Sequence, residues 1–167
     1  ATAWNQADAR RAGAVPDDQG IGALYDTLDY GIAKFLRQTG IERVVIGVSG
    51  GIDSAVAAAL YTRILGPDRV LLANLPSIHN SPTTKTLAEA LAKNLGCLYT
   101  VFPIQEAVNH TVEKLTATPV INLRTGEQTF LAVTSFMTEN IQARDRSARV
   151  LAGLAAAFGG GFTCNAN

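Results

Sequence analysis

Two hydrophobic patterns alternate along the chain and predict two kinds of element. Short β-branched runs such as Val44 to Val48 are typical of strands buried on both faces of a sheet. Longer segments carry apolar residues every three or four positions, as at Leu24, Leu28 and Ile32, which is the spacing of a helix. We expect strands at 44–48, 70–75, 98–102 and from 162 onward. We expect helices at 24–36, 55–65, 81–95, 104–115 and 131–158.

The order of these elements predicts the α/β class. Strands that alternate with helices favour a doubly wound parallel sheet with helices on both faces. Residues 1–20 show no hydrophobic period and are interpreted as a flexible leader or linker, so the folded domain is expected to span 21–167. Residues 116–128 show no regular pattern and are expected to form an irregular connection.

Composition and charge argue against several classes of protein. With 47% apolar and only 17% charged residues, the chain is expected to fold rather than remain disordered. Its 14 basic and 14 acidic side chains balance, so we expect neither a nucleic acid nor a membrane surface as a partner. Cys97 and Cys164 match no metal-binding spacing and are expected to be buried thiols. Because the first residues do not resemble a signal peptide either, the sequence indicates a cytoplasmic protein.

The clearest chemical signal is the turn from Ser49 to Ser54, between the first expected strand and a helix. Gly50 and Gly51 allow a tight turn that brings backbone N–H groups close to a ligand. The free N–H groups and the positive dipole end of the helix face the same point, and the two serines add hydroxyl donors. Asp53 would repel phosphate but suits Mg²⁺, which bridges carboxylate and phosphate oxygens. The turn therefore predicts a site for a phosphate chain and magnesium.

Other interpretations of this turn remain open. It has no lysine, so it is not a Walker A loop, and it does not match the dinucleotide fingerprint. Residues 47–51 do match the nucleophile elbow G-x-S-x-G, which would make Ser49 the nucleophile of a serine hydrolase. Such an enzyme needs a histidine base, and the sequence offers only His79 and His110. A Gly-rich turn with a purely structural role is a further alternative.

Three segments resemble a known family. A hydrophobic strand followed by Ser-Gly-Gly-Ile-Asp-Ser is similar to the signature of the PP-loop ATP pyrophosphatases. Within that superfamily, Ala-Asn-Leu-Pro-Ser at 73–77 and Glu-Asn-Ile-Gln-Ala-Arg-Asp-Arg at 139–146 resemble NAD synthetases. Residues 163–167 resemble the strand that leads into that family's N-K-[ST]-E turn. The resemblance covers about 21–167 and implies an adenine nucleotide alpha-hydrolase-like fold.

The resemblance also implies roles for individual residues. Asp53 and Arg144 would be catalytic, and Asp53 would bind the implied cofactor Mg²⁺. Phe136, Asn140 and Arg146 would bind nicotinate adenine dinucleotide, although Phe136 is as well explained by a core role. For Arg144 the alternative is a surface salt bridge. The residues implied for ATP and pyrophosphate are Ser49, Gly50, Gly51, Asp53, Ser54, Asn74, Leu75, Arg144 and Asn165.

The implied reaction is a two-step ligation of small molecules. ATP would adenylate the nicotinate carboxylate, and ammonia, free or released from glutamine, would then give NAD, AMP and pyrophosphate. A glutaminase domain would lie outside this sequence. The family also implies a homodimer, for which the face formed by Leu24, Leu28 and Phe35 is either interface or, as is more usual, core.

The sequence departs from the family pattern at three positions. Ile78 replaces an arginine and Asn165 a threonine that many relatives carry. The sequence ends at Asn167, before an expected lysine and glutamate, so we expect the C-terminal part of the domain to be missing. The alternatives are another PP-loop enzyme (GMP synthetase-like or tRNA thiolase-like), the serine hydrolase, and an adenine-nucleotide-binding fragment without activity.

Overall fold

The computed structural model describes residues 18–76 and 82–165, in two compact units that divide at Gly40. Among these residues, no helix combines the length and the apolar character needed to cross a membrane. Each unit is described by itself.

The first unit contains helix α2 (Asp18–Thr39). The helix is longer than the predicted 24–36 and begins inside the segment expected to be a leader, whose residues 1–17 lie outside the described part of the chain. Leu24, Leu28 and Phe35 are 55%, 43% and 54% exposed. Within this unit, described by itself, the apolar face of the helix is therefore exposed.

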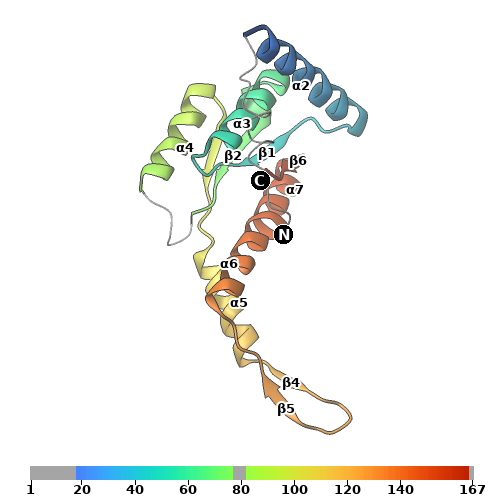
Figure 1. The fold of residues 1–167 in the computed structure, drawn as a ribbon, viewed down its shortest axis with the longest axis vertical. Helices are drawn as coiled ribbons and strands as arrows, with labels where there is room; N and C mark the ends of the chain where they lie inside the picture. Colours follow the sequence, from blue (N-terminus) through green and yellow to red (C-terminus); the bar gives the residue numbers. More distant parts are fainter. Residues whose placement is uncertain (1–17, 77–81, 166–167) are drawn as a thin grey trace, which may run out of the picture. The chain divides into compact units, whose positions relative to one another are not determined.

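The second unit is built on a sheet of four parallel strands (Figure 1). The strand order is β3-β2-β1-β6, so β1 pairs with β2 on one side and with β6 on the other. The predicted parallel sheet is confirmed. Each of the first three strands ends one residue earlier than the sequence predicted, because the chain turns there into the loops of the carboxyl edge. The strands are β1 (Val44–Gly47), β2 (Val70–Asn74), β3 (Leu98–Val101) and β6 (Gly161–Thr163).

Helices cover both faces of this sheet. The chain passes through α3 to β2 and through α4 to β3, and it later returns to add β6 on the other side of β1. Because parallel crossovers are right-handed, this reversal puts α7 on the face opposite α3 and α4. The doubly wound arrangement is thus confirmed. The elements are α3 (Ile52–Leu65), the short 3₁₀ helix η1 (Pro67–Arg69), α4 (Pro82–Leu95) and α7 (Ala152–Phe158).

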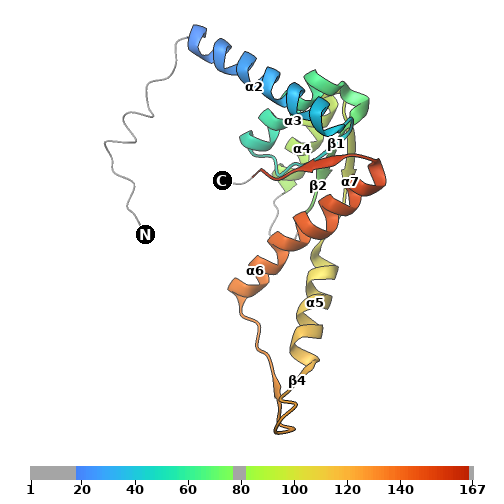
Figure 2. The same ribbon diagram turned by 90° about the vertical axis from the view of Figure 1, so that its right-hand side faces the viewer.

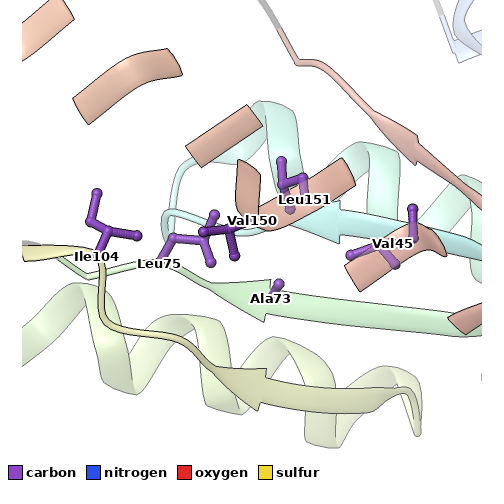
Figure 3. Packing of buried hydrophobic residues seen from close by; sticks show 7 residues of the cluster. Val45, Ala73, Leu75, Ile104, Val150 and Leu151 are labelled. Atoms are coloured by element: carbon purple, nitrogen blue, oxygen red, sulfur yellow. The ribbon is translucent and has the colours of Figure 1, made fainter. Parts of the chain in front are cut away.

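The core explains why the first strand is apolar throughout. On one face, Val45 packs in a cluster with Val150 and Leu151 (Figure 3). Because side chains alternate between the faces of a strand, Val44 and Ile46 are buried on the other face, at 3% and 0% exposure. Each such fully buried aliphatic side chain stabilises the fold by about 1.5–3 kcal/mol.

The helix expected at 131–158 begins later and contains a change of helix type. α6 (Ser135–Arg144) is followed directly by the π-helix η2 (Asp145–Leu151) and then by α7. Figure 2 shows α6 and α7 as parts of one continuous rod. The Oγ1 atom of Thr134 accepts a hydrogen bond from the Met137 N–H at 3.3 Å, and this N-cap sets the start of the helix.

The connection at 116–128, expected to be irregular, contains a β-hairpin. Helix α5 (Gln105–Ala117) leads into β4 (Pro119–Ile121), which is antiparallel to β5 (Gln128–Phe130). The Oδ1 atom of Asn122 accepts two backbone N–H bonds, at 3.0 and 3.3 Å, and closes the turn. Strands of three residues are too short to show a period of two, which is why the sequence pattern missed them.

Candidate functional site

A cavity of about 460 Å³ lies at the carboxyl edge of β1, β2 and β6. Its position follows from the topology, because the strand order reverses between β2 and β6 on either side of β1. Ligands of open α/β sheets bind at such a switch point, outside the carboxyl ends of the strands. The cavity is lined by the turn after β1, the ends of β2 and β6, and one face of η2.

The turn after β1 is shaped by its two glycines. Gly50 has a φ of 84°, in the left-handed region that a residue with a Cβ rarely adopts. A Cβ on Gly51 would lie 3.3 Å from the Oγ of Ser49, and that Oγ accepts the Gly51 N–H at 3.3 Å. The turn therefore folds back on itself closely, as the sequence predicted for a loop that exposes backbone to a ligand.

Helix α3 begins at this turn with its first amides uncapped. Its N-cap residue is Gly51, and no side chain accepts a capping hydrogen bond there. Free N–H groups and the positive end of the helix dipole therefore face the cavity. Asp53 lies in the first turn, is exposed and lines the cavity, whereas the hydroxyl of Ser54 is turned inward and donates to the Gly51 carbonyl at 3.0 Å. This is the arrangement of an anion site with one carboxylate at its side.

The ends of β2 and β6 form the neighbouring walls. Asn74 and Leu75 are buried, at 3% and 7% exposure, and both line the cavity. The Nδ2 of Asn74 donates to the Tyr99 hydroxyl at 3.4 Å, which orients the carboxamide. Asn165 follows β6 and also lines the cavity. The structure thus brings these three predicted residues next to the glycine turn.

Of the two predicted arginines, one lines the cavity and the other does not. Arg146 lies on η2 and lines the cavity, where burial lowers the pKa of its guanidinium while the charge of Asp145 raises it. Arg144 is exposed and does not line the cavity. Its Nη1 donates to the Asn140 carbonyl and to the Asn140 Oδ1, both at 3.2 Å.

Phe136 and Asn140 lie on α6, and neither lines the cavity. Phe136 is 71% exposed, so it does not belong to the core of the described structure. The Nδ2 of Asn140 donates to the Phe136 carbonyl at 3.0 Å. Together with Arg144 these residues form a separate polar and aromatic stretch of the same helix.

Several cavity residues were not predicted. Thr163 and Cys164 line the wall at the end of β6, and their position directly before Asn165 was the available signal. Ser147 and Leu151 line the wall from η2. No sequence signal identified them. The sequence pattern was interpreted with the period of an α-helix, and a π-helix points its side chains in other directions.

Two chemical alternatives can be compared with this geometry. A serine hydrolase needs a histidine near Ser49, but no histidine lines the described cavity wall. His110 lies on α5, in a different hollow beside Phe102, and His79 lies outside the described residues. For a metal, the described residues contain no group of three His, Cys, Asp or Glu side chains. A single carboxylate, Asp53, fits Mg²⁺ held jointly with substrate phosphates, since this ion often uses one or two carboxylates.

Comparisons with known proteins agree on one family. The family model described as NAD synthase matches residues 17–157. The chain is 36% identical over 92 residues to a glutamine-dependent NAD(+) synthetase of Thermotoga maritima, a match that covers 55% of this chain and 16% of that protein. It is 40% identical over 91 residues to an NH(3)-dependent NAD(+) synthetase of Pyrococcus horikoshii, covering 54% of this chain and 35% of that protein.

A solved structure is similar over nearly the whole chain. It is a glutamine-dependent NAD+ synthetase from Acinetobacter baumannii in complex with ADP, with a TM-score of 0.76 and 25% identity. The match covers 92% of this chain but 27% of that one. The chain therefore spans only a minor part of the length of these relatives.

Proposed function

Because this chain belongs to the NAD synthase family, we propose that it carries the ATP-binding and adenylating part of an NAD synthetase. The observation that carries this proposal is the cavity at the switch point, where the uncapped N-terminus of α3, Asp53 and Arg146 converge. The related A. baumannii structure was obtained with ADP, which supports an adenine nucleotide as the ligand.

The proposed reaction joins a carboxylate to ammonia at the expense of ATP. A nicotinate carboxylate oxygen attacks the α-phosphorus of ATP, the bond to the β-phosphate oxygen breaks, and pyrophosphate leaves. Ammonia then attacks the carbonyl carbon of the adenylate, loses a proton, and AMP leaves as the amide of NAD forms. No covalent bond to the protein is needed, so the residues act by positioning and by stabilising charge.

In this proposal the residues of the cavity have distinct tasks. The amides at the start of α3 and the hydroxyl of Ser49 bind the phosphate oxygens that will leave as pyrophosphate. Arg146 supplies a cation, and Asn74 and Leu75 contact the adenine end. Asp53 would hold Mg²⁺, which supplies compensation of the negative charge on the phosphates when it is bound.

The dinucleotide substrate is proposed to bind along α6. Phe136 offers an exposed ring for stacking against the nicotinate, and Asn140 offers an amide beside it. Arg144 would reach the reacting groups by leaving its present hydrogen bonds to Asn140.

The proposal also includes the source of nitrogen, the oligomeric state and the cellular location. The relatives include both glutamine-dependent and NH(3)-dependent enzymes, so the nitrogen comes from ammonia either directly or through a glutaminase domain. A homodimer is supported by the exposed apolar side chains of Leu24, Leu28 and Phe35. A cytoplasmic location is supported by the free thiols of Cys97 and Cys164.

The first experiment is mass-spectrometric product analysis with ATP, Mg²⁺, nicotinate adenine dinucleotide and ammonia. We expect NAD and AMP in equal amounts, and only when all four are present. AMP formed with a different acceptor in place of the dinucleotide would instead favour another PP-loop enzyme. Labelling of Ser49 by a fluorophosphonate, without NAD formation, would favour the hydrolase and contradict the proposal.

A further inference from the structure

An ion pair inside η2 lies directly beside the cation of the cavity. The Oδ1 and Oδ2 atoms of Asp145 accept hydrogen bonds from the Nε and Nη2 of Arg149 at 2.5 and 2.8 Å. The Asp145 side chain is only 10% exposed. A two-pronged pair between a planar guanidinium and a carboxylate is a strong and directional contact. The residue that follows Asp145 in the sequence is Arg146, which lines the cavity.

The π-helical backbone of η2 points some of its side chains to the cavity and others to the sheet. Within seven residues, η2 directs Arg146 to the cavity and buries Val150 and Leu151 against the sheet. A π-helix is rare, and its wider turn is less favourable than an α-helical one, so it persists where other contacts hold it. The Asp145–Arg149 pair joins the first turn of η2 to its second and is suited to hold it.

The pair is also tied to a second wall of the cavity. The Arg149 guanidinium lies over the Phe102 ring, 5.7 Å from its centre. The Phe102 N–H donates to the carbonyl of Asn74 at 2.8 Å, and Asn74 lines the cavity. One continuous set of contacts therefore runs from the end of β2 through Arg149 and Asp145 to the backbone that carries Arg146.

We propose that Asp145 and Arg149 are positioning residues that hold the π turn so that the guanidinium of Arg146 meets a phosphate group in the cavity. This inference rests on the proposed function, because it needs a phosphate-bearing substrate there. ATP and nicotinate adenine dinucleotide both carry phosphate, so each is a candidate for the group that Arg146 meets.

The test is a double-mutant cycle read out by calorimetric binding of ATP and, separately, of the dinucleotide. Asp145→Asn and Arg149→Lys each remove the two-pronged pair, and Arg149→Lys keeps the charge and the solubility of the chain. Each is combined with Arg146→Met. Glu42→Gln is the matched control, since it removes a looser surface pair with Arg69 at 3.9 Å.

We expect Asp145→Asn and Arg149→Lys to weaken binding of one of the two ligands by about five- to tenfold. In the Arg146→Met background the same changes should have less than about a twofold effect, because the group they position is gone. The ligand that shows this coupling is the one whose phosphate Arg146 meets, and the Glu42→Gln control should bind like the parent.

Equal losses in both backgrounds would mean a general structural role and overturn the positioning proposal. So would unchanged binding in Asp145→Asn and Arg149→Lys while the parent chain binds normally. If the parent chain binds neither ligand, the proposed function itself is overturned, and this inference with it.

Discussion

At the scale of single residues, Thr163 has a feature that the rest of the cavity wall lacks. Its Oγ1 is buried and has no hydrogen-bond partner among the described residues. A buried hydroxyl left unpaired costs about 1–3 kcal/mol of stability. Thr163 lines the cavity, so a small rotation of its side chain would let a ligand there bond to the hydroxyl and offset this cost.

We expect Thr163→Val to raise the free energy of unfolding of the free protein by about 1 kcal/mol, because a methyl group replaces an unpaired hydroxyl of similar shape. The same change should weaken ATP binding. Urea unfolding and calorimetric binding measure the two effects, and Thr163→Ser, which keeps the hydroxyl, is the control. A loss of stability in Thr163→Val would show that the hydroxyl already has a partner.

The residues of the Ser49–Ser54 turn show how much a local motif predicts about a site. The sequence predicted Ser49, Gly51, Asp53 and Ser54 as a group, and they line one cavity because they are neighbours in a single turn. Gly50 does not line it but supplies the positive φ of that turn. By contrast, nothing local in the sequence indicated that Arg146 lines the cavity and Arg144 does not.

At the scale of elements, the backbone at the entry into β6 passes very close to the residue before β1. A Cβ on Gly160 would lie 2.0 Å from the carbonyl oxygen of Arg43, the residue that precedes β1. The next N–H, of Gly161, donates to that same carbonyl at 3.0 Å. Gly160 therefore allows the last described strand to dock beside the first.

We expect Gly160→Ala to lower the free energy of unfolding by about 3 kcal/mol, because the backbone of β6 or β1 must move. Gly153 is the matched control. It lies within α7 with open space around its Cα and no positive φ. Gly153→Ala should be more stable than the parent by about 0.5–1 kcal/mol. Urea denaturation of both variants checks this pair, and equal stabilities would contradict the packing described for β6.

The elements themselves were predicted unequally. The strands before and after α3 were clear because each is short, apolar and bounded by glycine or proline. The hairpin of β4 and β5 was missed, and the change from α6 to η2 was not visible. A π turn depends on contacts such as that of Leu151 with the sheet, and these do not alter the local hydrophobic period.

At the scale of the whole molecule, stability should depend on pH through two groups in or beside α3. Burial raises the pKa of the Cys97 thiol, although the hydrogen bond with Thr62, at 2.9 Å, lowers it in part. Burial also raises the pKa of the Tyr61 hydroxyl. A folded-state pKa above the unfolded value means that the folded chain holds the proton more tightly. The thiol therefore has no effect on stability well below its unfolded pKa, and it lowers stability as pH rises above that value.

We expect the free energy of unfolding to fall as the pH rises through about 8.5, where the thiol of the unfolded chain is half ionised. Urea unfolding between pH 7 and 10 measures the slope, and Cys97→Ala should flatten the first part of it. A curve that rises over this range, or one unchanged by Cys97→Ala, would contradict the assigned direction.

By itself, the sequence determined the class of fold, the glycine turn and the family resemblance. These depend on residues close together in the chain: a β-branched run predicts a buried strand, and two glycines beside a helix start predict an anion site. The resemblance also implied Asn74, Leu75 and Asn165 as ATP-binding residues, and the structure places all three on the cavity wall, whereas their contact with ATP stays a prediction.

Only the tertiary structure decided which side chains complete the cavity. β6 lies beside β1 although most of the chain separates them, and this pairing brings Thr163 and Cys164 to the wall. Packing of Val150 and Leu151 on the sheet, together with the Asp145–Arg149 pair, accompanies the π turn that directs Arg146 inward. Such directions depend on contacts between distant segments, and a local pattern of hydrophobic and polar positions does not contain them.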